Sequence, residues 1–337
     1  SVGSFDATKA RTRKGVLDVV AIDGIAVAVV ADNWWRANKA LQEIEINWDT
    51  NGNGDVSSDT ILDQFKASLD APDAAPLANN AGDADQALAN AEQVLEAEYF
   101  TPFLSHSPME PMGATVRITG DRVDIWASTQ SPEGLVTEMV NALGVEAENV
   151  YAHRVQAGGG FGRRGTITHL AEAADVAKQT GKPIQLVWTR EDDIRQGPFR
   201  PASLMRIKAG VDESGQLVAW DTARAGGNIS PNTFRTLLPA MYPWLADFLV
   251  EGVANASEMF FENFSTDESS TEGLFEDYDQ PNTRVTHMTV EHGLPLTFWR
   301  AVGHSYTAFA KESMIDEIAQ AAGIDEVTCR LQNTQRS

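Results

Sequence analysis

The feature that most constrains this chain is the run Gly158-Gly159-Gly160-Phe161-Gly162-Arg163-Arg164. It separates a strand-like run over 150–156 from a helix-like run over 167–180. Glycine loses more backbone freedom on folding than any other residue, so a cluster of glycines needs a reason. A backbone that passes close to an anion, with its N–H groups turned towards it at a helix start, is the usual one. Arg163 and Arg164 add two cations whose forked donors suit phosphate. The run predicts a phosphate-bearing cofactor, and a glycine-rich turn with solvated arginines is the alternative.

The charge balance argues against two classes of partner. Lys plus Arg is 26 and Asp plus Glu is 48, which gives a net charge of −22. We therefore expect neither nucleic acid nor an anionic membrane surface as a partner. Cys329 is the one cysteine, so the sequence predicts no internal disulfide and no multi-thiolate metal site. No apolar run reaches transmembrane length, and residues 1–14 lack the apolar core of a signal peptide.

The hydrophobic periodicity predicts an α+β chain. We expect a small α/β module over 1–49, a linker and helical connection over 50–93, and a larger domain over 94–337. The linker holds a surface connection around Pro72 and Asn79-Asn80. The expected strands are 15–22, 25–31 (after a turn at Asp23-Gly24), 43–48, 94–101, 114–119, 123–127, 150–156, 184–189, 204–209, 217–222 and 285–290. The expected helices are 34–42, 57–69, 83–92, 132–143, 167–180 and 305–322, and a last helix starts at Asp325; the acidic stretch 251–280 is expected to be a long loop.

A rival interpretation comes from the spacing Gly160-x-Gly162-x-x-Gly165. It matches the dinucleotide fingerprint, and Glu191 and Asp192 follow the next expected strand. That pattern predicts an NAD-dependent Rossmann oxidoreductase. However, two further glycines separate it from the strand, and a pair of arginines stands where small or apolar residues are expected. The NAD interpretation therefore ranks second.

Five motifs, in this order, resemble those of the xanthine dehydrogenase and aldehyde oxidase superfamily. The branch most similar to them is the molybdopterin-binding subunit of the isoquinoline 1-oxidoreductase type, and the resemblance runs from about Gly15 to the C-terminus. The motifs are Met109-Glu110-Pro111, Ser128-Thr129-Gln130-Ser131, Gly158 to Arg164, Trp188-Thr189-Arg190-Glu191-Asp192-Asp193, and Phe298-Trp299-Arg300-Ala301-Val302-Gly303-His304-Ser305.

The resemblance implies a fold and a set of roles. The fold is the tail of a small α/β hammerhead-like module followed by the first half of a molybdopterin-binding domain. Gln130 and Arg300 are the implied catalytic residues: the Gln130 amide bonds an oxygen of the metal centre, and Arg300 binds cofactor or substrate. Val302 replaces an aromatic residue of the substrate pocket. The implied cofactor-binding residues are Gln130, Gly159, Gly160, Phe161, Gly162, Arg163 and Arg164, with Phe161 and Gly162 beside the metal. Because the pterin holds the metal, no direct protein ligand is implied, and the six histidines are expected to be ordinary polar residues.

The implied activity is hydroxylation of an aldehyde or N-heterocycle, with water as oxygen donor. The implied cofactor is molybdopterin cytosine dinucleotide with molybdenum. The implied partners are a small 2Fe-2S subunit, the missing C-terminal half of the large subunit, a cytochrome or quinone acceptor and a small-molecule substrate, in a periplasmic or membrane-associated setting. The family's base is a glutamate in a Gly-x-Gly-Glu segment, and none follows Gly303. The isolated chain is therefore expected to be inactive; a non-catalytic, partner-binding fragment is the other alternative.

Overall fold

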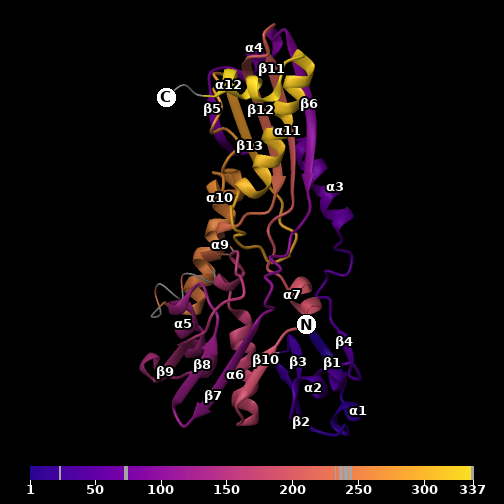
Figure 1. The fold of residues 1–337 in the computed structure, drawn as a ribbon, viewed down its shortest axis with the longest axis vertical. Helices are drawn as coiled ribbons and strands as arrows, with labels where there is room; N and C mark the ends of the chain where they lie inside the picture. Colours follow the sequence, from indigo (N-terminus) through magenta and orange to yellow (C-terminus); the bar gives the residue numbers. More distant parts are fainter. Residues whose placement is uncertain are drawn as a thin grey trace. The chain divides into compact units, whose positions relative to one another are not determined.

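The computed structural model describes residues 1–22, 24–71, 75–231, 233–234, 238, 242 and 245–334 (Figure 1). Asp23 and Pro72, for which the sequence predicts a turn and a surface connection, lie outside these residues. Contacts group the chain into a first unit, formed by 1–55, 106–197 and 236–245, and a second unit, formed by 56–105, 198–235 and 246–337. The predicted sequential boundaries at residues 49 and 93 stay a prediction.

A four-stranded sheet with the order β10-β7-β8-β9 is the centre of the first unit. β7 pairs antiparallel with β8 and β10, whereas β8 and β9 are parallel. Two helices pack against the sheet, and Val116, Ile125, Met139 and Leu170 form part of the core between them. The elements are β7 (Gly113–Thr119), β8 (Arg122–Ala127), α5 (Pro132–Leu143), β9 (Val150–Arg154), α6 (Thr168–Thr180), β10 (Ile184–Val187) and α7 (Arg190–Arg195).

The sheet topology excludes the Rossmann interpretation. In a dinucleotide-binding unit, the strand after the glycine loop and its helix lies in a parallel sheet directly beside the strand before them. Here the strand after α6 is β10, at the far edge of the sheet from β9. β10 runs in the same direction as β9, but β7 and β8 lie between them, and β7 is antiparallel to both of its neighbours. The glycine spacing is present without the adjacent parallel strands that the fingerprint requires, so the NAD interpretation is wrong.

The N-terminal residues add two small antiparallel pairs to the first unit, β1 with β4 and β2 with β3. Asn33 caps α2 by accepting a hydrogen bond from the Arg36 N–H, as its position before an amphipathic run predicts. Ile22 at the end of β2 joins the core of the larger sheet. The elements are β1 (Val2–Asp6), α1 (Thr8–Arg11), β2 (Val16–Ile22), β3 (Ala26–Ala31), α2 (Trp34–Leu41) and β4 (Glu45–Trp48); sequence reasoning missed β1 and α1.

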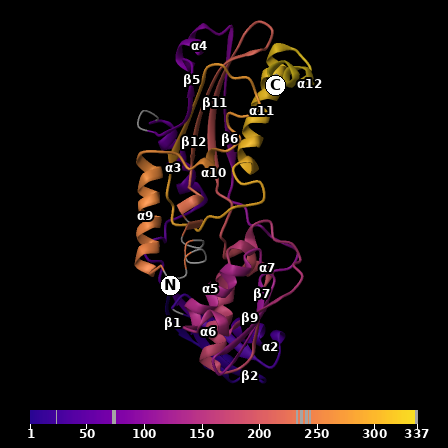
Figure 2. The same ribbon diagram turned by 90° about the vertical axis from the view of Figure 1, so that its left-hand side faces the viewer.

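The second unit is a five-stranded sheet with helices on both faces (Figure 2). Successive side chains of β11 point to opposite faces of the sheet. Met205 and Ile207 pack with α11 on one face, whereas Leu204 packs with α3 on the other. The strand order is β5-β13-β12-β11-β6, and only β12 and β13 are parallel neighbours. The elements are α3 (Ser58–Leu69), β5 (Leu77–Ala81), α4 (Ala84–Asn90), β6 (Gln93–Thr101), β11 (Ser203–Val211), β12 (Leu217–Gly226), β13 (Thr283–Thr289), α11 (His304–Ala322) and α12 (Glu326–Asn333).

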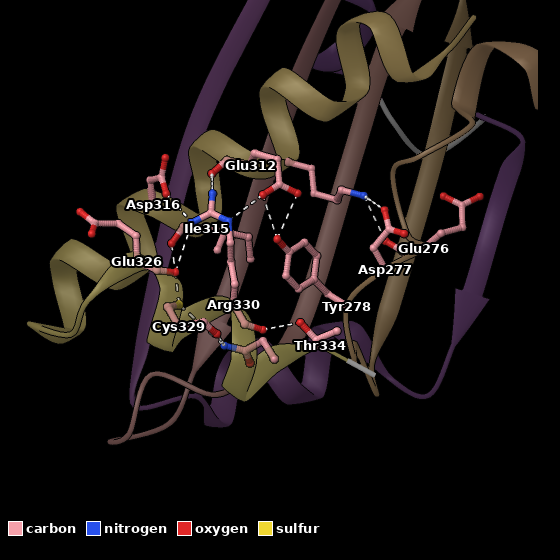
Figure 3. Close-up of polar contacts among 12 residues, drawn as sticks. Glu276, Asp277, Tyr278, Glu312, Ile315, Asp316, Glu326, Cys329, Arg330 and Thr334 are labelled. Carbon is pink, nitrogen blue, oxygen red and sulfur yellow. Dashed lines mark hydrogen bonds and ion pairs between the residues drawn. The ribbon is translucent and has the colours of Figure 1, made fainter. Parts of the chain in front are cut away.

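Polar contacts attach α12 to α11 and to the loop before β13. Arg330 bonds Glu312 and Asp316 of α11, and the Tyr278 hydroxyl donates to Glu312 (Figure 3). Lys311 is buried and reaches the Asp277 carboxylate at 2.6 Å. The Arg330 bonds hold α12 on α11, and the Tyr278 and Lys311 bonds hold α11 on the loop before β13. None of the helices in the described ranges has the length and apolar character that a membrane span requires.

Two sequence predictions in the second unit are wrong. The stretch 251–280 is not a long loop, because it contains most of α9 (Asp247–Asn263) and all of α10 (Glu268–Thr271). α9 carries apolar residues on both faces, since Ala254 is buried while Val253 and Phe260 are exposed, and this obscures the helical period. The expected surface connection contains β5, an edge strand whose Ala-Asn-Asn-Ala composition gives little strand signal.

The core beneath α11 gives a stability prediction. Met314 is fully buried in the cluster that joins α11 to the sheet, whereas Met259 on α9 is 58% exposed. Met314→Ala should lower the free energy of unfolding by about 2–5 kcal/mol, because it removes buried methylenes and leaves a cavity. The matched change Met259→Ala should stay within about 0.5 kcal/mol of the parent. Urea unfolding of both variants checks this, and equal losses would show that α11 does not cover the sheet.

Candidate functional site

Three sequence motifs come together in the first unit at the glycine loop, residues 158–164. Gly158 lies against Glu110: a Cβ at Gly158 would stand 2.5 Å from the Glu110 Cβ. Gly160 lies against Gln130, where a Cβ would overlap the side-chain amide. These two approaches explain why side chains are excluded at Gly158 and Gly160. The glycines serve close contacts within the unit, and the Phe161 ring of the same loop lies next to Gly159.

The sequence predicts that the loop leads directly into a helix, but in the structure it does not. A short 3-10 turn, Arg163–Gly165, follows the glycines, and α6 begins only at Thr168. The unpaired N–H groups of the α6 N-terminus are therefore not those of the loop. Any ligand at the loop depends on loop backbone groups and neighbouring side chains, because the field of a helix end acts only within its first turn.

Hydrogen bonds to the loop backbone orient the side-chain amide of Gln130. Its Oε1 accepts from the Gly162 N–H at 3.1 Å and from the Arg164 N–H at 3.3 Å. The Gln130 N–H in turn donates to the Arg164 carbonyl at 3.0 Å. Because both partners of the side chain are donors, the oxygen of the amide must face the loop and the NH₂ group must face away from it. The Gly162 N–H, which the family resemblance assigns to an oxygen ligand of the metal, donates here to Gln130.

Arg164 is buried beneath the loop and bonds three protein groups. It is 0% exposed. Its Nε donates to the Gly159 carbonyl at 2.6 Å, and one terminal nitrogen donates to the Glu110 carbonyl at 2.8 Å and to the Glu110 carboxylate at 2.7 Å. The alternative of solvated arginines is therefore wrong, because Arg163 is also buried, with 1% exposed. The phosphate contacts expected of these two side chains stay a prediction.

A second group of buried polar side chains lies behind the loop. Arg163 donates to the Thr166 carbonyl at 2.9 Å and stands 5.5 Å over the Trp188 ring, whose Nε1 donates to Glu172. Burial, helped by the two nearby guanidinium groups, lowers the pKa of His169 to about 3, so the imidazole is neutral. Burial also raises the pKa of Glu172 and Asp193. Sequence reasoning missed this cluster, because nothing in the local pattern shows that these residues face inward.

Several atoms of this cluster have no hydrogen-bond partner among the described residues. They include both ring nitrogens of His169, the Nε of Arg163 and the Nη1 of Arg164. Buried polar groups are almost always satisfied, and ordered water or a bound polar group does this where protein does not. Buried side chains next to the loop therefore have hydrogen-bonding atoms that no described residue pairs with.

Arg300 and Val302 belong to the second unit, in the turn that precedes α11. Their φ angles are 29° and 48°, and the Val302 N–H donates to the Trp299 carbonyl at 2.7 Å. Such angles are unusual for any residue with a side chain and costly for a β-branched one. Six non-glycine residues of the described chain have positive φ, and four lie in the family motifs or their immediate flanks: Ser107, Phe161, Arg300 and Val302. Strain concentrated in this way is typical of functional sites.

Comparison with known proteins finds related chains. Residues 70–233 match the family model described as the molybdopterin cofactor-binding domain. The chain is 29% identical over 322 residues to a nicotinate dehydrogenase subunit of Pseudomonas putida, and the match covers 95% of this chain and 25% of that protein. It is 27% identical to the beta subunit of isoquinoline 1-oxidoreductase of Brevundimonas diminuta, and this match covers 98% of this chain and 41% of that protein. The chain thus spans well under half the length of these relatives.

Solved structures have the same fold. The aldehyde oxidoreductase of Desulfovibrio gigas aligns over 99% of this chain and 38% of its own, with a TM-score of 0.70 and 18% identity. Quinoline 2-oxidoreductase from Pseudomonas putida 86 aligns over 99% of this chain and 44% of its own, with a TM-score of 0.69 and 17% identity. At these identities the likeness concerns the fold alone.

The neutral His169 gives a pH prediction. In the unfolded chain its pKa returns to the ordinary value of 6.5, and in the folded chain it is about 3. Its contribution to stability is therefore complete above pH 6.5 and is lost as the pH falls towards 3, at up to about 1.4 kcal/mol per pH unit. His169→Gln should flatten the fall of the unfolding free energy between about pH 6.5 and pH 4. Urea unfolding at several pH values measures this.

If His169→Gln keeps the pH dependence of the parent, His169 is not held neutral in the folded chain.

Proposed function

Because this chain belongs to the xanthine dehydrogenase and aldehyde oxidase family, as part of a molybdopterin-binding subunit, we propose that it forms one wall of the active site of a molybdenum hydroxylase. The substrate class is an aldehyde or N-heterocycle, and water is the oxygen donor. The observation that carries the proposal is the orientation of Gln130, whose amide oxygen is occupied by the loop while its NH₂ group faces outward. An amide held in this way is a preorganised donor for an anionic or oxo group.

The residues of the loop fit a molybdenum cofactor. The backbone at Gly158 and Gly160 carries no side chains of its own, and the space of their missing Cβ atoms is taken by Glu110 and Gln130, which brings both side chains directly against the loop. Gln130 supplies the donor, and Phe161, which is 42% exposed, supplies an apolar face beside it. When bound, the cofactor supplies the two-electron oxidation chemistry. The protein supplies binding and orientation, so donors and glycines suit the site better than metal-ligating side chains.

Other residues of the chain have supporting roles in the proposal. The Gly159, Gly160 and Gly162 backbone and the spare donors of Arg163 and Arg164 hold the pterin portion. Arg300 on its strained turn binds cofactor or substrate, and its permanently charged fork suits negative charge near the reacting centre. Val302 borders the substrate, and its small side chain leaves room for a ring or an aldehyde chain.

Further proposals concern the partner subunits, the form of the cofactor and the location of the complete enzyme. Two relatives are named as subunits, and the chain spans 25% and 41% of them, which supports an assembly of several parts. We infer a small 2Fe-2S subunit, a cytochrome or quinone acceptor, and a further segment of the large subunit that supplies the glutamate base. We also infer the cytosine dinucleotide form of the cofactor and a periplasmic or membrane-associated location. A net charge of −22 supports a small-molecule substrate over nucleic acid.

The cofactor proposal predicts the composition of the complete assembly. It should contain molybdenum at about one atom per large subunit and release a cytosine nucleotide on acid hydrolysis. Elemental analysis and chromatography of the released nucleotide measure both. An active assembly without molybdenum would contradict the proposed function. A guanine nucleotide, or none, would contradict only the cytosine dinucleotide form.

The role of Gln130 can be tested with a change of one atom group. Gln130→Glu keeps an oxygen for the Gly162 and Arg164 N–H groups, replaces the NH₂ donor by a second oxygen and adds one negative charge. Turnover in the complete assembly should fall by roughly tenfold to a hundredfold. This is the effect of losing one hydrogen bond to a charged group or to charge that develops in the transition state. Steady-state kinetics and thermal unfolding measure the loss and the integrity of the fold.

Gln185→Glu is the control for that change, because Gln185 is exposed on β10. It introduces the same charge into the same unit and should leave turnover unchanged. Unchanged turnover in Gln130→Glu would show that the NH₂ group has no part in the reaction.

A further inference from the structure

We propose that Glu110 is a positioning residue: through Arg164 and the Gly158 amide, it holds the glycine loop in the shape that orients Gln130. The part of this proposal that concerns a cofactor rests on the proposed function. The attachment of the loop to Glu110 rests only on the geometry of the first unit. The family resemblance assigns no role to this glutamate, and it is not the family's base.

Glu110 closes the N-terminal end of the loop with a pair of reciprocal hydrogen bonds. Its carboxylate accepts from the Gly158 N–H at 2.8 Å, and its own N–H donates to the Gly158 carbonyl at 3.1 Å. The same carboxylate oxygen lies 3.4 Å from the Ser128 hydroxyl, which donates to it. One side chain thus bridges all three motifs that form the site.

Glu110 also neutralises the cation under the loop. The Glu110 side chain is 44% exposed, whereas the Arg164 side chain, which its carboxylate meets at 2.7 Å, is fully buried. Burial lowers the pKa of Arg164 and the Glu110 charge opposes this shift, so the folded loop depends on a counter-charge. A buried cation that loses a carboxylate at hydrogen-bond distance is strongly destabilised in place and tends to move towards water.

Movement of Arg164 would be transmitted directly to Gln130. The Arg164 N–H bonds the Gln130 Oε1, the Arg164 carbonyl accepts from the Gln130 N–H, and the same carbonyl accepts from the Thr129 hydroxyl at 3.2 Å. Arg164 is therefore the link between the carboxylate and the amide. Loss of the Glu110 charge should loosen the loop and release Gln130 from its orientation.

The segment that carries Glu110 is itself rigid. Arg190 of α7 bonds the carbonyls of Pro108 and Met109, and it also pairs with the buried Asp193. Two prolines flank Glu110 and restrict its backbone. The carboxylate is thus presented from a fixed support, which a positioning residue requires.

Limited trypsin digestion of the chain 1–337 tests the proposal without any cofactor. Arg163 and Arg164 are cleavage sites, but both are buried, so the bonds after them should resist trypsin. Glu110→Gln keeps the shape of the side chain and removes its charge. We expect cleavage after Arg163 and Arg164 to become about tenfold faster, the effect of one weakened charge-assisted contact on local opening. Mass spectrometry of the fragments measures the rate at each site.

Glu191→Gln is the matched control, because Glu191 is exposed in the first turn of α7. It should leave cleavage at the loop unchanged. Arg164→Gln tests the link: if Glu110 acts through Arg164, the double variant Glu110→Gln/Arg164→Gln should be cleaved after Arg163 no faster than Arg164→Gln alone. A gain in the double variant over Arg164→Gln would contradict a shared action.

Two further outcomes overturn the proposal. Unchanged cleavage after Arg163 and Arg164 in Glu110→Gln would show that the carboxylate does not hold the loop. Faster cleavage at all arginines and lysines together, with a lower melting temperature, would make Glu110 a residue of general stability. Molybdenum retained by the Glu110→Gln assembly after dialysis is a separate readout, and we expect it to fall. A parent assembly without molybdenum would contradict the proposed function, while the trypsin result would still decide the role of Glu110.

Discussion

The ion pair between the buried Arg164 and the half-exposed Glu110 is the contact on which the site depends. A guanidinium enclosed by protein is unfavourable unless its donors are used, and here they bond two carbonyls and one carboxylate. The glycine loop can wrap around this cation because it has no side chains at the points of closest approach. Gln130 then bonds the outer side of the same loop. The order of support thus runs from carboxylate to cation, from cation to loop backbone, and from backbone to amide.

Backbone strain is concentrated at two short segments of the described chain. Phe161 in the first unit and Arg300 and Val302 in the second have left-handed backbone angles that side chains disfavour. Each lies beside a well-packed element: the glycine loop before α6, and the turn before α11, whose apolar face is part of the sheet core. Rigid surroundings can impose such angles, and in enzymes they commonly serve preorganisation of a binding site. The two sheets with their helices therefore act as supports for two short irregular segments.

The sequence predicted most of the regular structure, because local signals decide it. Alternation along β11 and β12, the Asn33 cap and the proline that begins α5 all act within a few residues. The α9 helix was missed because its apolar residues surround it, and β5 was missed because an edge strand of alanine and asparagine has no strong preference. The family resemblance assigned Gln130 and the glycine loop to one cofactor site, which stays a prediction; the structure shows that Gln130 and the loop are hydrogen-bonded to each other. The resemblance could not show that Arg163 and Arg164 turn inward, because the direction of a side chain depends on partners far away in sequence. The dinucleotide spacing misled for a related reason: glycine spacing does not encode which strand β10 pairs with.

The presentation of the Gln130 amide by the loop to a molybdenum centre is tested most directly by a density map of the complete, cofactor-loaded assembly. We expect the Gln130 Nε2 to lie about 3 Å from an oxygen ligand of the metal, within hydrogen-bond distance, while its Oε1 stays on the loop backbone. The glycine loop should border the pterin in the same map. Cofactor density remote from the loop, or a Gln130 side chain turned away from the metal, would contradict this role.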